Sequence, residues 1–240
     1  MQKTIKSLIK TVLNLGPSWL CEWEFRHQRF YGFNERPVEL AFVFRKLAEI
    51  YPRNILDVGT GTTALPHLMR NCGSFVTAVD NVRGYWSEDM FNRHYHVIDD
   101  DITDTRIKGP FDLITCISVL EHIEKSDHAV RNMFTLLNPN GHLILTFPYS
   151  EQGYVRNVYE LPGSNYGQDK PYITQSYSRT DLDRWLRENR GVIAEQEYWQ
   201  FWEGGHWTVG PQIVPPRKVG AGERHQLSCI HITKQNTRTY

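Results

Sequence analysis

Cysteine is scarce in this sequence, and long apolar runs are missing. The 240 residues contain four cysteines, and no two of them stand in a C-x-x-C pair. The spacing therefore gives no indication of a zinc ribbon or a thioredoxin-like redox site. Because disulfides are rare in reducing compartments, we interpret this cysteine usage as that of a cytoplasmic protein with free thiols.

Net charge is also lacking, since 27 Lys and Arg residues balance 27 Asp and Glu residues. Nucleic-acid-binding domains are usually strongly basic, so we expect no nucleic-acid partner. The uncharged stretch at residues 11–21 is too short to cross a bilayer and contains Gly16 and Pro17. The pair His94 and His96 has no evident third ligand, so we expect no metal site.

Residues 1–15 carry apolar side chains at helical spacing, interrupted by Lys3, Lys6 and Lys10. This pattern predicts a basic amphipathic helix in a helical extension over residues 1–34, ahead of a single domain at residues 35–240. Such a helix can make peripheral contact with an anionic membrane. Most such helices instead pack on their own domain or on a second copy of the chain, here in a homodimer. The sequence leaves these alternatives open.

Short apolar runs alternate with helical stretches through the middle of the chain. The expected strands are residues 54–58, 75–79, 95–98, 111–118 and 142–147, and the expected helices are residues 35–50, 63–71, 127–137 and 178–189. This alternation predicts an α/β fold whose parallel sheet is covered by helices on both faces. Two further strands, at residues 192–202 and 226–233, are expected near the end of the chain.

A loop rich in small residues follows the first expected strand, reading Asp57-Val58-Gly59-Thr60-Gly61. The two glycines allow a sharp turn and a close approach of the backbone to a ligand. Asp80 ends the second expected strand, where a carboxylate can accept hydrogen bonds from both ribose hydroxyls. The pattern therefore indicates a site for a nucleoside-containing ligand.

Two kinds of cofactor fit this loop. The spacing Gly59-x-Gly61-x-x-Ala64 matches the dinucleotide fingerprint, so a nicotinamide-dependent Rossmann oxidoreductase is one alternative. However, Asp57 lies two residues before the first glycine, and a carboxylate there repels a pyrophosphate. A positively charged cofactor instead gains from that carboxylate, which favours a sulfonium ligand.

The segment Val119-Leu120-Glu121-His122 and the acids Asp99-Asp100-Asp101 add to the glycine loop. Together these residues resemble the class I S-adenosylmethionine-dependent methyltransferases, in particular the small-molecule, methyltransferase type 11-like group. The resemblance covers roughly residues 53–150. It implies a Rossmann-like, doubly wound sheet of seven mostly parallel strands with a terminal antiparallel strand, and S-adenosylmethionine as the cofactor.

The same resemblance implies a set of cofactor-binding residues. These are Asp57, Gly59, Thr60, Gly61, Asp80, Asn81, Asp101, Ile102, Ser118, Val119 and Glu121. By that resemblance the glycines pass under the methionine and ribose, Asp80 binds the ribose, and Asp101 with Ile102 brackets the adenine. One departure is Thr63, which stands where the family has a third glycine.

The acceptor side is expected in two insertions, residues 148–177 and residues 203–225. The first carries six tyrosines, whose flat rings and hydroxyls suit a sugar or an aromatic acceptor, although a tyrosine-rich dimer contact is an alternative. The second holds His206 beside two glycines. Because histidine titrates near neutral pH, His122 and His206 are both candidates for the general base.

The sequence thus predicts in-line methyl transfer to a small-molecule or glycan acceptor, with oxygen favoured as the accepting atom. The glycan expectation rests on a resemblance to methyltransferases of cell-surface polysaccharide biosynthesis, carried by residues 34–39 and 145–149. A protein that binds S-adenosylmethionine without turnover is a further alternative.

Overall fold

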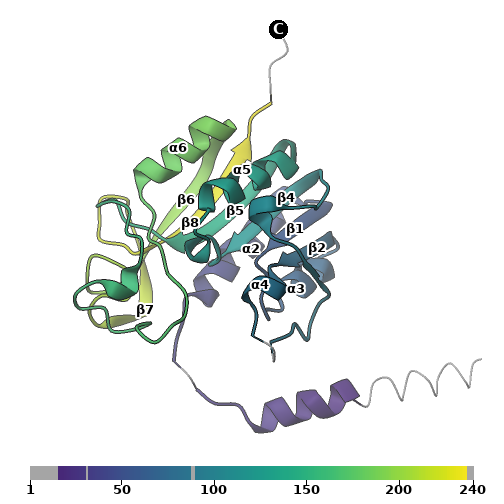
Figure 1. Ribbon diagram of the computed structural model, residues 1–240, viewed down its shortest axis with the longest axis horizontal. Coiled ribbons are helices and arrows are strands. Elements are labelled where there is room, and N and C mark those ends of the chain that lie inside the picture. Colours follow the sequence, from purple (N-terminus) through teal and green to yellow (C-terminus); the bar gives the residue numbers. More distant parts are fainter. Residues whose placement is uncertain (1–15, 31, 88–89, 237–240) are drawn as a thin grey trace, which may run out of the picture. The chain divides into compact units, whose positions relative to one another are not determined.

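A mixed β-sheet forms the centre of residues 35–240 in the computed structural model, which describes residues 16–30, 32–87 and 90–236 (Figure 1). Within these residues eight strands are arranged in the order β3-β2-β1-β4-β5-β8-β6-β7. Five of them are parallel, namely β1 (Asn54–Val58), β2 (Phe75–Asp80), β3 (Val97–Asp99), β4 (Phe111–Ile117) and β5 (Leu137–Pro148). Their carboxyl ends therefore meet at one edge of the sheet.

Three strands extend the sheet beyond β5. β8 (Leu227–Lys234) lies antiparallel between β5 and β6 (Gly191–Trp202), and β7 (Gln212–Val219) pairs with β6 at the far edge. The α/β fold with a mostly parallel sheet is confirmed, but the sheet has eight strands among the described residues, not seven. The extra strand, β7, contains Pro215 and Pro216, which made the segment read as a loop. Prolines are tolerated there because an edge strand does not need every N–H group.

Helices cover both faces of the sheet. They are α2 (Arg36–Ile50), α3 (Leu65–Asn71), α4 (Val82–Tyr85), α5 (Ser126–Leu136) and α6 (Arg179–Asn189), with short 3-10 turns η1 (Ile102–Asp104), η2 (Leu120–His122) and η3 (Val158–Glu160). One buried cluster contains side chains of α5 and α6, such as Met133 and Trp185. The other contains side chains of α2 and α3, such as Phe42 and Met69. The central strands β1 and β4 are mostly apolar because both of their faces are buried.

Most expected elements are found within two residues of their predicted ends, and β5 is the main exception. It begins at Leu137, directly after α5, because Leu137 already pairs with Phe111 of β4. A register shift follows, and regular pairing resumes at His142. The sequence indicated only this second part, since residues 138–141 carry no apolar alternation.

The chain divides into two units, residues 1–34 and residues 35–240. In the first unit, residues 16–26 form a helix. The amphipathic helix predicted for residues 1–15 lies outside the described residues. Among the described helices, none combines the length and the apolar character needed to cross a bilayer.

Candidate active site

Asp57, near the carboxyl end of β1, holds the glycine loop in place. Its carboxylate is almost fully buried and accepts hydrogen bonds from the hydroxyls of Thr60 (2.8 Å) and Thr115 on β4 (2.7 Å). Burial raises the pKa of Asp57 to about 6, against the lowering effect of these two hydroxyls. Asp57 thus ties the loop to the neighbouring strand.

Gly59 and Gly61 both adopt a positive φ, of 71° and 55°. A Cβ atom on Gly59 would lie 2.3 Å from Cγ1 of Val119, whereas one on Gly61 would meet no atom within 4 Å. The space above Gly61 is therefore open, which is what a ligand lying against the backbone requires. Thr63 fits without the third glycine, because its hydroxyl donates to the carbonyl of Thr60 at 2.9 Å.

Asp80, at the end of β2, faces the loop. Its Oδ2 accepts a hydrogen bond from the backbone N–H of Gly61 at 2.7 Å. Burial raises the pKa of Asp80, and the Gly61 N–H opposes this rise. The next residue, Asn81, uses its Oδ1 to cap α4 by accepting from the N–H of Gly84 at 2.9 Å. The structure thus brings Asp80 into the loop and turns the Asn81 side chain to a local capping role.

The three consecutive acids at the end of β3 have different surroundings. Asp99 pairs with the exposed Arg83 (3.1 Å). Asp100 is buried and accepts from the backbone N–H of Arg106 (3.1 Å). Asp101 is exposed, and its Oδ1 caps η1 by accepting from Thr103 N–H at 2.8 Å, while Ile102 beside it is buried.

The segment after β4 is held by a buried network that the sequence did not reveal. Ser118 has a positive φ of 49°, and its hydroxyl donates to Oε1 of Glu39 at 2.5 Å. The Thr146 hydroxyl donates to the same oxygen at 2.6 Å, and Arg36 pairs with Oε2 at 3.0 Å. Burial raises the pKa of Glu39, and Arg36 counteracts it. Through these contacts α2 fixes the ends of β4 and β5, so that Val119 lies over Gly59.

Arg36 also lines a cavity of about 140 Å³ beside the glycine loop, together with Asp57, Gly59, Thr60 and Ile117. Its guanidinium donates to the Ile117 carbonyl at 3.1 Å. Residues 34–39 were used above only as a stretch of resemblance, with no role for Arg36 or Glu39. Their partners on β4, β5 and the segment after β4 lie 79 to 107 positions away along the chain, so no local pattern could reveal them.

Glu121 and His122 lie on the short turn η2. The carboxyl of Glu121 is buried, and its Oε2 has no hydrogen-bond partner among the described residues. Burial raises the pKa of this carboxyl well above its usual range. Its Oε1 lies 4.0 Å from Nε2 of His122. A buried and unpaired carboxyl oxygen is costly, and this indicates that a ligand group completes the site.

The tautomer of His122 follows from its surroundings. Nδ1 lies 2.8 Å from the carbonyl oxygen of Ile173, which can only accept, so Nδ1 carries the proton and Nε2 is the basic nitrogen. Burial lowers the pKa of His122, and the contact with Ile173 partly opposes this. The imidazole is thus neutral near pH 7.

One tyrosine packs against His122, and two more lie near that tyrosine. The Tyr172 ring packs edge-on against the imidazole with the ring centroids 4.7 Å apart, and Tyr85 and Tyr159 lie 6.2 and 6.5 Å from Tyr172. By contrast, Tyr149 and Tyr177, which were expected to face the acceptor, are buried in the core beside Phe147. Their spacing in residues 148–177 could not distinguish the two groups.

The other histidine, His206, lies among different neighbours. It belongs to a turn between β6 and β7, where its carbonyl accepts from the N–H of Val209 at 3.2 Å. Burial lowers its pKa, and its Nδ1 is buried without a partner among the described residues. The adjacent Trp207 packs on Phe201, which fixes this turn to the α2 and α3 face of the sheet. Among the described residues, no group of three or more His, Cys, Asp or Glu side chains is arranged to hold a metal ion.

Known proteins are similar to this chain in sequence. The ubiquinone biosynthesis O-methyltransferase of Coxiella burnetii (strain Dugway 5J108-111) is 26% identical over 137 residues, which cover 54% of this chain and 57% of that protein. Its mitochondrial counterpart in Schizosaccharomyces pombe is 30% identical over 141 residues, covering 55% of this chain and 51% of that protein. The chain thus spans about half the length of these curated relatives.

Solved structures show the same fold. An S-adenosylmethionine-dependent methyltransferase from Clostridium acetobutylicum ATCC 824 has a TM-score of 0.54 at 14% identity, covering 92% of this chain and 99% of that one. Magnesium protoporphyrin IX methyltransferase (ChlM) from Synechocystis PCC 6803, with bound S-adenosylhomocysteine, has a TM-score of 0.51 at 13% identity, covering 96% and 99%.

The family assignment comes from a family model that matches a longer part of the chain. A family model described as a methyltransferase domain matches residues 25–192, which is more than half of the chain. This match displaces the nicotinamide-dependent alternative for the glycine loop. The chain belongs to the class I S-adenosylmethionine-dependent methyltransferases, and S-adenosylmethionine is its cofactor.

Proposed function

We propose that residues 35–240 form one methyltransferase domain that methylates a hydroxyl group of a small-molecule acceptor, with His122 as the general base. The single observation that carries this proposal is the tautomer of His122. Its Nδ1–H donates a hydrogen bond to the Ile173 carbonyl, so Nε2 is the basic nitrogen. A hydroxyl acceptor needs such a base, whereas an already unprotonated amine does not. The insertions at residues 148–177 and 203–225 are assigned to the acceptor side.

Bound S-adenosylmethionine supplies a methyl group on a positively charged sulfur. The residues fit such a ligand, because the backbone at Gly61 is open and the unpaired Oε2 of Glu121 offers a hydrogen-bonding partner. We assign the ribose to Asp80 and the methionine carboxylate to Arg36, which lines the cavity beside the loop. Asp57 acts through the loop, since both of its oxygens are taken by threonines.

The remaining cofactor residues divide by position. Asp101 and Ile102 would bracket the adenine, with the exposed carboxylate of Asp101 free on one oxygen to accept from an amino group. Thr60, Ser118 and Val119 shape the loop and its cover. Asn81 contributes through its backbone, because its side chain caps α4.

The chemistry assigned to His122 is a proton transfer coupled to displacement. With the methyl donor bound, the acceptor hydroxyl would donate its proton to Nε2 as its oxygen bonds to the methyl carbon, and the electron pair of the broken carbon–sulfur bond would stay on sulfur. The imidazolium that results keeps its Nδ1–H bond to Ile173 O, and the Glu121 carboxyl lies 4.0 Å from Nε2. The main task of the protein is to align the acceptor oxygen and exclude water.

Two features favour an aromatic hydroxyl. Tyr172 packs against His122, and Tyr85 and Tyr159 lie near Tyr172, so the surroundings of the base are aromatic, which suits a flat acceptor. In addition, the relatives described above are named as O-methyltransferases of ubiquinone biosynthesis. The glycan acceptor expected from the sequence stays a second prediction.

The experiment is a turnover assay with S-adenosylmethionine and a panel of phenols, catechols, amines and neutral sugars. We expect methylation of a hydroxylated aromatic compound, and we expect His122→Asn to lower kcat roughly 10²- to 10⁴-fold. The matched variant His206→Asn should keep kcat within roughly threefold, because its neighbours lie elsewhere. Transfer only to amines, or equal losses in the two variants, would contradict the proposal. Cofactor binding without turnover on any acceptor would favour the binding-protein alternative.

The first unit carries separate predictions. Trp19, Trp23 and Phe25 in the helix at residues 16–26 are exposed, which suits either a membrane surface or a second copy of the chain. Flotation with anionic liposomes tests peripheral membrane contact, and sedimentation tests the homodimer. The cytoplasmic location also stays a prediction, and fractionation of cells tests it.

A further inference from the structure

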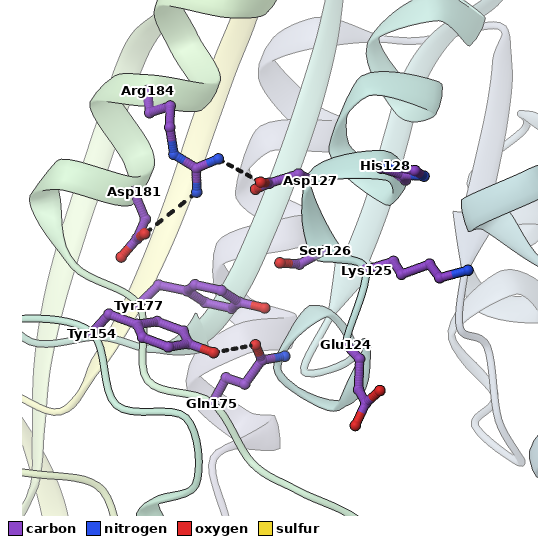
Figure 2. A pocket seen from close by; sticks show the side chains of 10 residues that line it. All are labelled: Glu124, Lys125, Ser126, Asp127, His128, Tyr154, Gln175, Tyr177, Asp181 and Arg184. Carbon is purple, nitrogen blue, oxygen red and sulfur yellow. Dashed lines mark hydrogen bonds and ion pairs between the residues drawn. The ribbon is translucent and has the colours of Figure 1, made fainter.

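A second, larger cavity lies between the first turns of α5 and α6 (Figure 2). Its volume is about 380 Å³, and its lining shares no residue with the cavity beside the glycine loop. Small-molecule sites usually occupy roughly 300–1,000 Å³. The cavity is therefore large enough for one small ring, and the methyl-transfer chemistry described above leaves it unused.

Aromatic and amide groups form one side of this cavity. Figure 2 shows the Tyr154 and Tyr177 rings beside each other, with Gln175 next to them. The Tyr154 hydroxyl donates to Oε1 of Gln175 at 2.7 Å, so its ring is held in place although about half of the side chain is exposed. A fixed, exposed aromatic face is a platform on which a ring can stack.

Charged groups form the opposite side, and their charges are largely compensated. Arg184 pairs with both Asp127 and Asp181, and the Trp185 indole N–H also donates to Asp127 at 2.6 Å. Lys125 and Glu124 add one charge of each sign at the rim. An anion here would meet three carboxylates, and a cation would compete with Arg184 for its partners. The electrostatics thus favour a neutral ligand.

The groups that line the cavity also have hydrogen-bond donors and acceptors to spare. Arg184 and Lys125 provide more N–H groups than their partners use, while the carboxylates of Asp127 and Asp181 have several lone pairs each. Donors and acceptors therefore both lie beside an aromatic platform. Hydroxyl groups both donate and accept, so a ring that carries several of them can satisfy both kinds of group at once.

We propose that this cavity is a binding site for a neutral sugar ring, which stacks on Tyr154 and places its hydroxyls against Asp127 and Arg184. The site is separate from the glycine loop, yet its floor contacts the turn that carries His122. Tyr177 donates to the carbonyl of Leu120 at 2.7 Å, and the Gln175 N–H donates to the carbonyl of Glu121 at 2.9 Å. A sugar bound here would therefore lie next to η2.

The test is a titration of the ¹⁵N-labelled protein with glucose, galactose, mannose and N-acetylglucosamine, without S-adenosylmethionine. Because the Trp185 indole N–H is bonded to Asp127, its cross-peak reports directly on the cavity. At least one sugar should shift this peak saturably and receive saturation transfer from the protein. If none of the four does so up to roughly 50 mM, the proposal is wrong.

A matched pair of variants locates the bound sugar. Tyr154→Ala should weaken the affinity roughly tenfold through loss of the platform. Tyr51→Ala, at an exposed tyrosine that ends α2, should leave it unchanged. Equal effects in the two variants would overturn the proposal. Since the titration omits the methyl donor, and since Tyr154→Ala should bind S-adenosylmethionine like the wild type, failure here is distinguishable from failure of the proposed reaction.

Discussion

Around the glycine loop, Asp57, Thr60 and Asp80 have their hydrogen bonds made, whereas near the acceptor side several buried polar atoms lack partners among the described residues. Those atoms are Nδ1 of His206 and Oγ of Ser176 in the two insertions, while Oε2 of Glu121, which we assign to the cofactor, also lacks a partner among those residues. The comparison teaches that the glycine loop is organised by the chain itself, while the acceptor half is completed by what it binds. Substitutions in the two halves should therefore change different quantities.

The largest effect on stability is expected for Gly59→Ala. The added Cβ would overlap Val119 at 2.3 Å in a backbone with positive φ, so we expect a loss of roughly 2–4 kcal/mol in the free energy of unfolding, measured by urea denaturation.

Gly61→Ala is the matched control for that substitution. It shares the positive φ but meets no atom within 4 Å, so it should cost only about 1 kcal/mol of stability. Its Cβ would, however, project into the open space assigned to the cofactor. Equal stability losses in the two variants would show that the packing of Val119 over the loop is wrong.

The next effect concerns binding of the cofactor. Asp80→Ala should weaken S-adenosylmethionine binding by about 1–3 kcal/mol in calorimetry, since the Gly61 N–H and the ribose hydroxyls lose their acceptor. Asp99→Ala removes a carboxylate that pairs with an exposed arginine, and it should change the affinity far less. A larger loss in Asp99→Ala would move the ribose away from Asp80.

The smallest effect tests the acceptor half. Tyr172→Ala should raise KM for the acceptor by an amount equivalent to roughly 0.5–1.5 kcal/mol, because one ring face next to His122 is lost. Cofactor affinity should stay the same. If the substitution weakened S-adenosylmethionine binding instead, the two halves would not be separable.

The same contrast explains how far sequence reasoning reached. The strands were predictable because burial on both faces leaves continuous apolar runs, as in β1 and β4. The glycine loop was predictable because its conformation needs glycine at a fixed place, as Gly59 shows. In both cases the constraint is local, so the residues themselves carry it.

Long-range contacts, by contrast, could not be predicted from the sequence. Arg36 and Glu39 are ordinary members of an amphipathic helix until β4 and β5 bring Ser118 and Thr146 to them. Asn92 likewise holds the loop through the carbonyls of Gly61 and Thr63. No spacing rule predicts such pairs, because the fold must form before the partners meet.

The most direct test of the proposed base is the pH dependence of kcat in the wild type and in His122→Asn. Burial lowers the pKa of His122 below its usual value of 6.5, and the base must be neutral to accept a proton. We therefore predict that kcat falls as the pH decreases through a single pKa below 6.5, and that this step is missing in the variant. A profile that is flat in this range, or a step that survives in His122→Asn, would contradict the account.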